Sequence, residues 1–187
     1  YFTWAKWVTP SRDLIKAFDD AGDTKRKNES IVYYQTTWSN YYDSKSYPFM
    51  YKCRSNVNSI IKLRGADILL LKAEALAHKN QLQEAAQVVN TVRKRVSLPD
   101  LNASSTSSKE NLLNAILLER RLELAFEGQR WFDLIRHNKL MEVMNNVNQR
   151  DAGRLKQARA FTQESELLPI PQPVLDENTN LVQNPGY

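Results

Sequence analysis

The spacing of apolar residues changes near residue 60. From Arg64 onward, Ala and Leu recur every three or four positions, which is typical of amphipathic helices. This spacing predicts one helix from Arg64 to about Lys79 and a second from Leu82 to about Val96. Their small and large residues have the relative spacing of a tetratricopeptide hairpin. Because one such hairpin cannot cover its own apolar face, we expect it to stack on another element.

Two further helices are predicted after a Ser/Thr-rich linker at residues 102–108. Ser107-x-x-Glu110 has the form of a capping box, so the first of these helices should begin there. Its apolar residues continue to Phe126, and Gly128 should end or kink it. The second helix should follow directly and contribute these core residues: Trp131, Phe132, Leu134 and Ile135.

The C-terminal region has a different pattern. Residues 146–160 are polar and basic, and we expect them to form a mobile or exposed segment. From residue 168 onward, closely spaced prolines favour an extended strap, with at most one helical turn after Pro173. The alternating apolar side chains of this strap predict that three residues pack on the helices: Leu168, Ile170 and Tyr187.

The first 60 residues are rich in aromatic side chains. Thirteen of the eighteen aromatic residues lie among the first 51 positions, together with many Thr, Ser, Asn and Asp. Short runs at residues 30–34 and 47–51 predict strands, and Ser11 should cap a helix that runs to Phe18. The predicted fold class is therefore mainly α: a tetratricopeptide-like helical hairpin with packed C-terminal helices, plus an aromatic, loop-rich N-terminal segment (residues 1–60) with short strands.

Size and charge restrict the possible functions. The chain has 187 residues, enough for one domain with a real core, and starts at Tyr1 without an initiator Met. We therefore expect a removed targeting segment or a longer parent protein. The net charge of +5 is spread thinly, with tight basic runs only at residues 25–27 and 93–95. A nucleic-acid groove would need more concentrated charge, so we expect no nucleic-acid partner.

The segment Glu119 to Arg136 reads ERRLELAFEGQRWFDLIR and combines four acids and four bases with large apolar residues. Three glutamates at four-residue spacing line one helix face, which raises the alternative of a carboxylate pair in a glycosidase. However, an arginine lies close in sequence to each acid, and such pairing keeps carboxylates ionised. We expect a structural ion-pair network formed by Glu119, Arg120, Arg121, Glu123, Glu127, Arg130, Asp133 and Arg136.

Other chemistry has little support in the sequence. The two histidines, His78 and His137, stand in no metal-binding motif, and the single cysteine, Cys53, excludes a cysteine-based zinc site. No glycine-rich phosphate loop or Gly-x-Ser-x-Gly elbow is present. We therefore expect no metal, no cofactor and no enzymatic activity.

Four ordered motifs resemble the SusD/RagB family of outer-membrane nutrient-binding lipoproteins. The charged segment is the most recognisable of them. The others are Asp23-x-x-Arg26, residues 64–75 with 90–95 (RGADILLLKAEA and NTVRKR), and the close, Leu168-Pro169-Ile170-Pro171 with Gln183-Asn184-Pro185-Gly186-Tyr187.

The resemblance implies a lipid-anchored protein on the outer surface of the outer membrane. Members of the family are mostly helical proteins of about 500 residues, so this chain would be roughly the C-terminal third. Its partners would be an oligosaccharide or polysaccharide and a SusC-like TonB-dependent transporter, and the lipid anchor would lie outside this chain. The alternative is a helical-repeat module that binds protein and has no sugar ligand.

The ligand residues of the family lie outside these motifs, so candidates must come from the chemistry of sugars. Sugars present C–H faces that stack on aromatic rings and hydroxyls that bond polar side chains. Residues 35–47 supply this mixture in a segment too polar for a core. We expect ligand contacts from Trp38, Asn40, Tyr41, Tyr42 and Asp43, with Trp4 and Trp7 as a second candidate pair.

Overall fold

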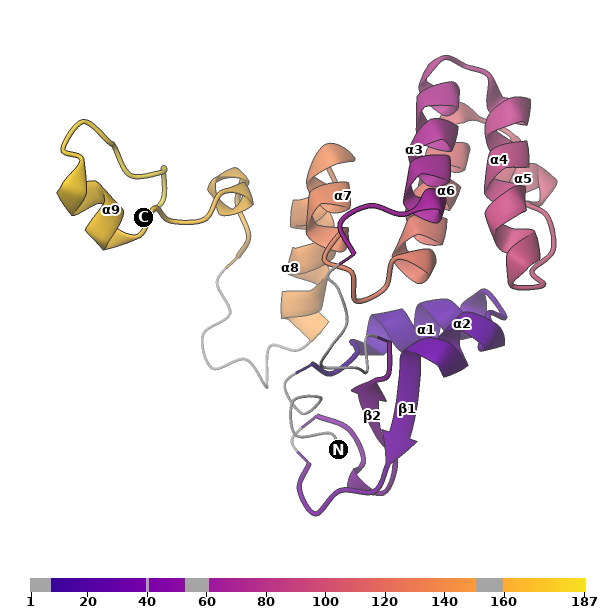
Figure 1. The fold of residues 1–187 in the computed structure, drawn as a ribbon, viewed down its shortest axis with the longest axis horizontal. Coiled ribbons are helices and arrows are strands. Elements are labelled where there is room, and N and C mark those ends of the chain that lie inside the picture. Colours follow the sequence, from indigo (N-terminus) through magenta and orange to yellow (C-terminus); the bar gives the residue numbers. More distant parts are fainter. Residues whose placement is uncertain (1–7, 40, 53–60, 151–159) are drawn as a thin grey trace. The chain divides into compact units, whose positions relative to one another are not determined.

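The computed structural model describes residues 8–39, 41–52, 61–150 and 160–187 (Figure 1). The chain divides into two compact units, Tyr1–Arg130 and Trp131–Tyr187. The mainly helical class predicted from the sequence is confirmed, with a two-stranded sheet in the first unit. Within the described ranges, no helix is both long and apolar enough to cross a membrane.

The predicted helical hairpin is formed by α3 (Gly65–His78) and α4 (Leu82–Arg95). Asn80 takes a left-handed backbone conformation, φ 62°, in the turn that joins them. The third helix, α6 (Lys109–Glu123), packs against both α3 and α4 and lies close to them in Figure 1. It therefore covers the apolar face that a single hairpin leaves open. The shared core contains Leu70, Ala73, Ala77, Ala85, Val89, Leu112 and Ile116.

A second layer comes from the aromatic N-terminal segment. α1 (Arg12–Asp20) begins after Ser11, whose side chain accepts the backbone N–H of Leu14, as predicted. The predicted strands are present as β1 (Ile31–Tyr34) and β2 (Tyr47–Met50), which pair antiparallel. Phe18 and Ile31 pack against Leu122 and Ala125, in and just beyond α6, so α6 contributes to both layers of the first unit.

Two short helices and both ends of α6 differ from the prediction. α2 (Thr24–Ser30) occupies residues that read as loop, and α5 (Ala103–Thr106) occupies the predicted linker. The N-cap of α6 is Ser108 rather than Ser107, because the hydroxyl of Ser108 accepts the backbone N–H of Asn111. α6 also ends at Glu123, before Gly128, and the chain turns through left-handed conformations at Phe126 and Gly128.

The second unit contains α7 (Arg130–Arg136), which starts at the unit boundary, and α8 (Leu140–Arg150). α7 was predicted, but only part of its expected core is buried: Leu134 is 2% exposed, whereas Phe132 is 65% exposed. α8 includes residues 146–150, the start of the segment expected to be mobile or exposed, and three of these five residues are exposed. Those residues are helical, two of them half-buried, while residues 151–159 lie outside the described ranges.

The tail contains a short 3-10 turn, η3 (Gln163–Glu166), and α9 (Gln172–Glu177) after the predicted proline. Gln183 joins the two ends of the tail through its side-chain amide. Its oxygen accepts the backbone N–H of Ile170 at 2.8 Å, and its NH₂ group donates to the Ile170 carbonyl oxygen at 2.9 Å. Tyr187 donates its hydroxyl to the Leu167 carbonyl at 3.0 Å. Leu168 and Tyr187 are 76% and 58% exposed within this unit, and their packing on the helices of the first unit stays a prediction.

Candidate functional site

The aromatic residues of the first unit gather on one face of the β1–β2 hairpin. In the antiparallel register, Val32 pairs with Phe49 and Tyr34 pairs with Tyr47, so these four side chains share a face. A short 3-10 turn, η2 (Ser44–Ser46), leads into β2, and the intervening loop returns Trp38 to this face. We call Tyr34, Trp38, Tyr42, Tyr47 and Phe49 the hairpin aromatic cluster.

The cluster has a buried base and an exposed upper layer. Tyr47 and Phe49 are 3% and 5% exposed and pack with their ring centroids 5.3 Å apart. The Trp38 ring lies 4.8 Å from Tyr47 and 6.4 Å from Phe49, yet Trp38 remains 36% exposed. Tyr34 is 45% exposed, with its ring 6.4 Å from Phe49. Rings supported from below in this way present flat apolar surface to the solvent.

The other predicted ligand residues have mixed placements. Tyr42 is half-buried and donates its hydroxyl to the Pro10 carbonyl at 2.8 Å, so part of its polar capacity is used within the fold. Tyr41 is half-buried beneath the Arg12 guanidinium, whose central carbon lies 4.5 Å from the ring centroid. Asp43 is exposed and accepts the backbone N–H of Lys45 at 3.0 Å. Trp4, Trp7 and Asn40 lie outside the described residues.

Tyr34 was absent from the predicted set, although the sequence carried a signal for it. Strand side chains alternate between faces, so any pairing of residue 34 with residue 47 places Tyr34 beside Tyr47. The same alternation puts Tyr33, which is 41% exposed, on the opposite face of β1. Tyr33 and Tyr34 therefore form a matched pair of exposed tyrosines on one strand.

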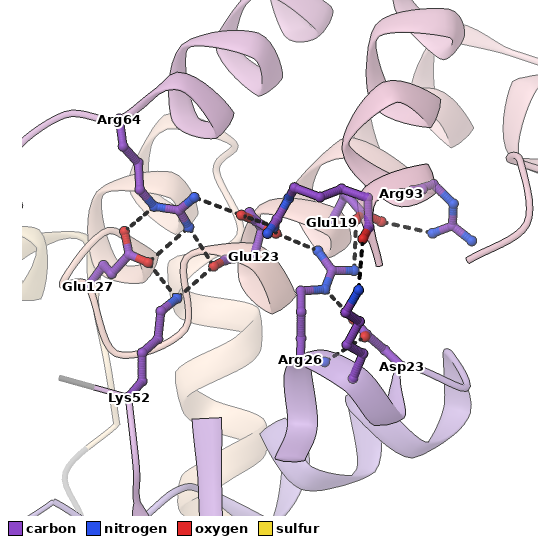
Figure 2. A network of polar contacts seen from close by, with 10 residues as sticks. Asp23, Arg26, Lys52, Arg64, Arg93, Glu119, Glu123 and Glu127 are labelled. Carbon is purple, nitrogen blue, oxygen red and sulfur yellow. Dashed lines mark hydrogen bonds and ion pairs between the residues drawn. The ribbon is translucent and has the colours of Figure 1, made fainter. Parts of the chain in front are cut away.

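A second notable feature is the buried charge at the C-terminal end of α6 (Figure 2). Glu119 forms ion pairs with Arg26 at 2.8 Å and with Arg93 at 2.8 Å. Glu123 contacts three arginines: Arg26 at 3.0 Å, Arg64 at 2.7 Å and Arg95 at 2.6 Å. These bases come from three parts of the chain, so the two glutamates join α6 to α2, to the start of α3 and to α4.

The same network continues beyond α6. Glu127 binds Arg64 at 2.7 Å and Lys52 at 2.5 Å, and Figure 2 shows Arg64 reaching both Glu123 and Glu127. Asp23 caps α2 by accepting the Arg26 N–H and also pairs with the Arg26 side chain. The three glutamates that were predicted to line one helix face are therefore bound by bases that lie elsewhere in the chain.

The electrostatics keep these carboxylates charged. Burial alone would raise the pKa of Glu123, but hydrogen bonding to Arg64 and the charges of Arg64 and Arg95 outweigh it, so the pKa is lowered. Burial likewise opposes ionisation of Glu127, yet Arg64 and Lys52 lower its pKa. A general acid needs the opposite shift. This pair is therefore suited to holding the fold together rather than to proton transfer.

The other members of the predicted network are distributed as follows. Arg120 is buried and binds Asp67 at 2.7 Å, and Asp133 is buried and binds Arg136 at 3.1 Å. Arg121 is half-buried; burial lowers its pKa, and only the charge of Asp13 opposes that shift. Arg130 is half-buried at the start of α7. Arg120 binds Asp67 and Arg121 lies near the charge of Asp13, so the ion pairs described above for the three glutamates come from bases elsewhere in the chain.

Within the described part of the chain, no cluster of three or more His, Cys, Asp or Glu residues could hold a metal ion. The bases that neutralise the glutamates were missed because helix-face spacing only finds partners three or four residues away. Arg26, Arg93 and Arg95 lie 93, 26 and 28 residues from their partners Glu119, Glu119 and Glu123.

Comparisons with known proteins agree with the fold. Residues 8–187 match the SusD family. A SusD-like protein of Formosa agariphila is 40% identical over 135 residues, which cover 69% of this chain and 25% of that protein. The chain thus spans about a quarter of that relative's length.

Solved structures point the same way. A SusD superfamily protein from Bacteroides vulgatus aligns with a TM-score of 0.72 and 21% identity. The alignment covers 96% of this chain and 44% of the chain of that protein. A laminarin binding SusD-like protein aligns with a TM-score of 0.60 and 27% identity. The alignment covers 95% of this chain and 38% of the chain of that protein. Because the family match extends over nearly the whole sequence, the chain belongs to the SusD family.

Proposed function

We propose that the protein carrying this chain is a cell-surface saccharide-binding component of an outer-membrane nutrient uptake system. The observation that carries the proposal is the hairpin aromatic cluster, with Trp38 and Tyr34 exposed above buried rings. Membership of the SusD family and the likeness to a laminarin binding SusD-like protein support the same conclusion.

The cluster is suited to stacking on sugar rings. The apolar C–H face of a pyranose packs on a flat indole or phenol, and the Tyr hydroxyl provides a polar edge for sugar hydroxyls. Trp38 is already supported by Tyr47 and Phe49, so little conformational entropy is lost when a ligand covers it. In this proposal Trp38 and Tyr34 contact the ligand, while Tyr42 and Tyr47 hold the platform in place.

The proposed role is capture and transfer, not hydrolysis. Glu123 and Glu127 are held in ion pairs with Arg64, which favours the ionised form of both. We propose that the saccharide passes from this protein to a SusC-like TonB-dependent transporter, with the protein attached to the outer membrane by a lipid anchor. Co-isolation of the intact protein with such a transporter from outer membranes tests the transfer partner.

The binding test uses two tyrosines of the same strand as a matched pair. Calorimetry of the intact protein with a panel of oligosaccharides should identify a ligand, and Trp38→Ala should weaken its binding by about tenfold or more. Tyr34→Ala should also weaken binding, whereas Tyr33→Ala, on the opposite face of β1, should not. Equal affinity in the parent and the Trp38→Ala variant would remove the cluster from the binding site. Failure of every oligosaccharide to bind would overturn the proposed function.

A further inference from the structure

The two short basic runs of the sequence lie next to each other in the folded protein. Lys25, in α2, donates a hydrogen bond of 3.2 Å from its ammonium group to the carbonyl oxygen of Arg95 at the end of α4. Beside this contact is a cavity of about 250 Å³, and both residues line it. Residues that are 70 positions apart in sequence thus form one rim.

The lining of this cavity carries surplus positive charge. Five basic residues line it: Lys25, Arg26, Lys52, Arg64 and Arg95. Three acids line it as well, Glu29, Glu123 and Glu127, so five positive charges face three negative ones. A recess with walls of one dominant sign concentrates the electric field and attracts ions of the opposite sign.

The bases deep in the cavity are fully engaged, whereas those at the rim are not. Arg64 uses all three guanidinium nitrogens on Glu123 and Glu127. Arg95 instead contacts Glu123 through Nη2 alone, at 2.6 Å to each carboxylate oxygen, and its side chain is 58% exposed. Among the described residues, Nε and Nη1 of Arg95 have no hydrogen-bond partner, and Lys25 has only the bond to the Arg95 carbonyl.

This difference follows from the charge count of the network. Four acids are buried, Asp23, Glu119, Glu123 and Glu127, and four bases already bind them without Arg95, namely Arg26, Lys52, Arg64 and Arg93. The charges of these four acids and four bases already balance, so Arg95 is a fifth base in contact with a neutral group of side chains. Its charge exceeds the number that balances the four acids, so the exposed part of its guanidinium group remains available to an external anion.

We propose that Lys25 and Arg95 form an anion-binding site that takes a single carboxylate or sulfate group, carried by an acidic saccharide. Nε and Nη1 of Arg95 can each donate one charge-assisted hydrogen bond to an oxygen of a carboxylate or sulfate, and Lys25 adds a mobile point charge. Glu29 on the same lining repels further negative charge, so the site should hold one anionic group of a ligand at a time. The saccharide as carrier rests on the proposed function; the anion site itself does not.

The test compares an acidic ligand with its neutral form. Calorimetry of the intact protein would use an oligogalacturonate and the same oligomer with its carboxylates methyl-esterified, at low and at high ionic strength. The acidic form should bind about tenfold more tightly, and salt should reduce that preference. Lys25→Gln combined with Arg95→Gln should abolish the preference. Lys79→Gln, which removes an exposed charge beyond the end of α3, should leave it intact.

A second probe separates the anion site from saccharide binding. Inorganic sulfate should raise the unfolding temperature of the parent more than that of Lys25→Gln, a variant that leaves every buried ion pair in place. Sulfate binding without any saccharide binding would keep the anion site and overturn the proposed function. Equal binding of the acidic and esterified oligomers, or an undiminished preference in the double variant, would overturn the anion site alone. If neither sulfate nor the oligogalacturonate binds, the anion site is overturned.

Discussion

At the scale of single residues, Glu123 shows how this sequence tolerates so much buried charge. Its carboxylate accepts from Arg26, Arg64 and Arg95, and its backbone carbonyl accepts from Lys52 and Arg64. Transfer of a lone carboxylate from water into a protein interior is costly, but here each oxygen has charged donors. The arrangement stabilises one specific relation among the elements that supply those donors.

We predict that Glu123→Gln destabilises the protein by about 3–5 kcal/mol, because it leaves the buried Arg26 without one of its compensating charges. The change preserves the volume of the side chain, so the loss reports on charge rather than packing. Urea denaturation would measure it. Glu84→Gln, at an exposed position of α4, should cost about 0.5 kcal/mol or less. Equal stability of the two variants would contradict the structural role of Glu123.

The lowered pKa values of Glu123 and Glu127 predict a specific dependence on pH. In the unfolded chain these groups take up protons near the ordinary glutamate pKa of about 4.3, whereas in the folded protein they do so only at lower pH. Unfolding therefore takes up protons in this range, and stability falls as pH falls. The free energy of unfolding should be level near neutral pH and drop below about pH 4. A double Glu123→Gln, Glu127→Gln variant should lose much of that slope.

At the scale of the elements, the sequence predicted what apolar periodicity can detect. α3, α4, α6 and both strands were expected close to their observed bounds, because each buries apolar residues at helix or strand spacing. α2 was missed because its sequence, TKRKNES, contains no apolar residue. Its helix is instead fixed by the Asp23 cap and by the ion pairs of Arg26, which depend on residues far along the chain.

The candidate sites were likewise predictable from the sequence only in part. The aromatic composition of residues 35–47 indicated the region of the cluster, and Trp38 lies on it. The supporting rings Tyr47 and Phe49 belong to the predicted strand at residues 47–51, but their contact with Trp38 depends on how the intervening loop folds back. The rim formed by Lys25 and Arg95 could not be predicted, because nothing local to either basic run specifies the other.

The start of α6 offers a direct test of one local difference. Ser107 was predicted as the N-cap, whereas the structure places Ser108 in that role, with its hydroxyl 3.1 Å from the Asn111 nitrogen. Ser108→Ala should cost about 1 kcal/mol of stability, the usual loss for a helix N-cap. Ser107→Ala, one residue earlier and at an exposed position, should cost only a few tenths of a kcal/mol. If denaturation experiments showed a larger loss of stability for Ser107→Ala than for Ser108→Ala, they would support the capping box inferred from the sequence.

At the scale of the whole first unit, α6 joins two layers that have separate cores. One face of α6 packs with α3 and α4 through Leu112 and Ile116, and its C-terminal end packs with α1 and β1 through Leu122. Arg26 adds a polar link, because it ties α2 to both Glu119 and Glu123. The N-terminal layer is small, so we expect its attachment to depend strongly on this link.

We therefore predict that Arg26→Met loosens the N-terminal layer selectively. Methionine keeps much of the apolar stem but leaves Glu119 and Asp23 buried with fewer compensating charges. Hydrogen exchange measured by mass spectrometry should speed up by on the order of a hundredfold in the amides of α1, α2 and β1. The amides of α3 and α4 should change much less, because their core with α6 does not include Arg26.

Lys27→Met is the matched control for this experiment. Lys27 lies on the same short helix. Among the described residues it pairs only with Asp19, whose side chain is 55% exposed, so its loss should alter exchange little. Acceleration confined to α1, α2 and β1 in Arg26→Met would identify the N-terminal layer as a separate cooperative unit held by buried charge. Uniform acceleration across α3, α4 and α6 would instead mean that both layers open together. The ion-pair network would then stabilise the unit as a whole rather than the attachment of one layer.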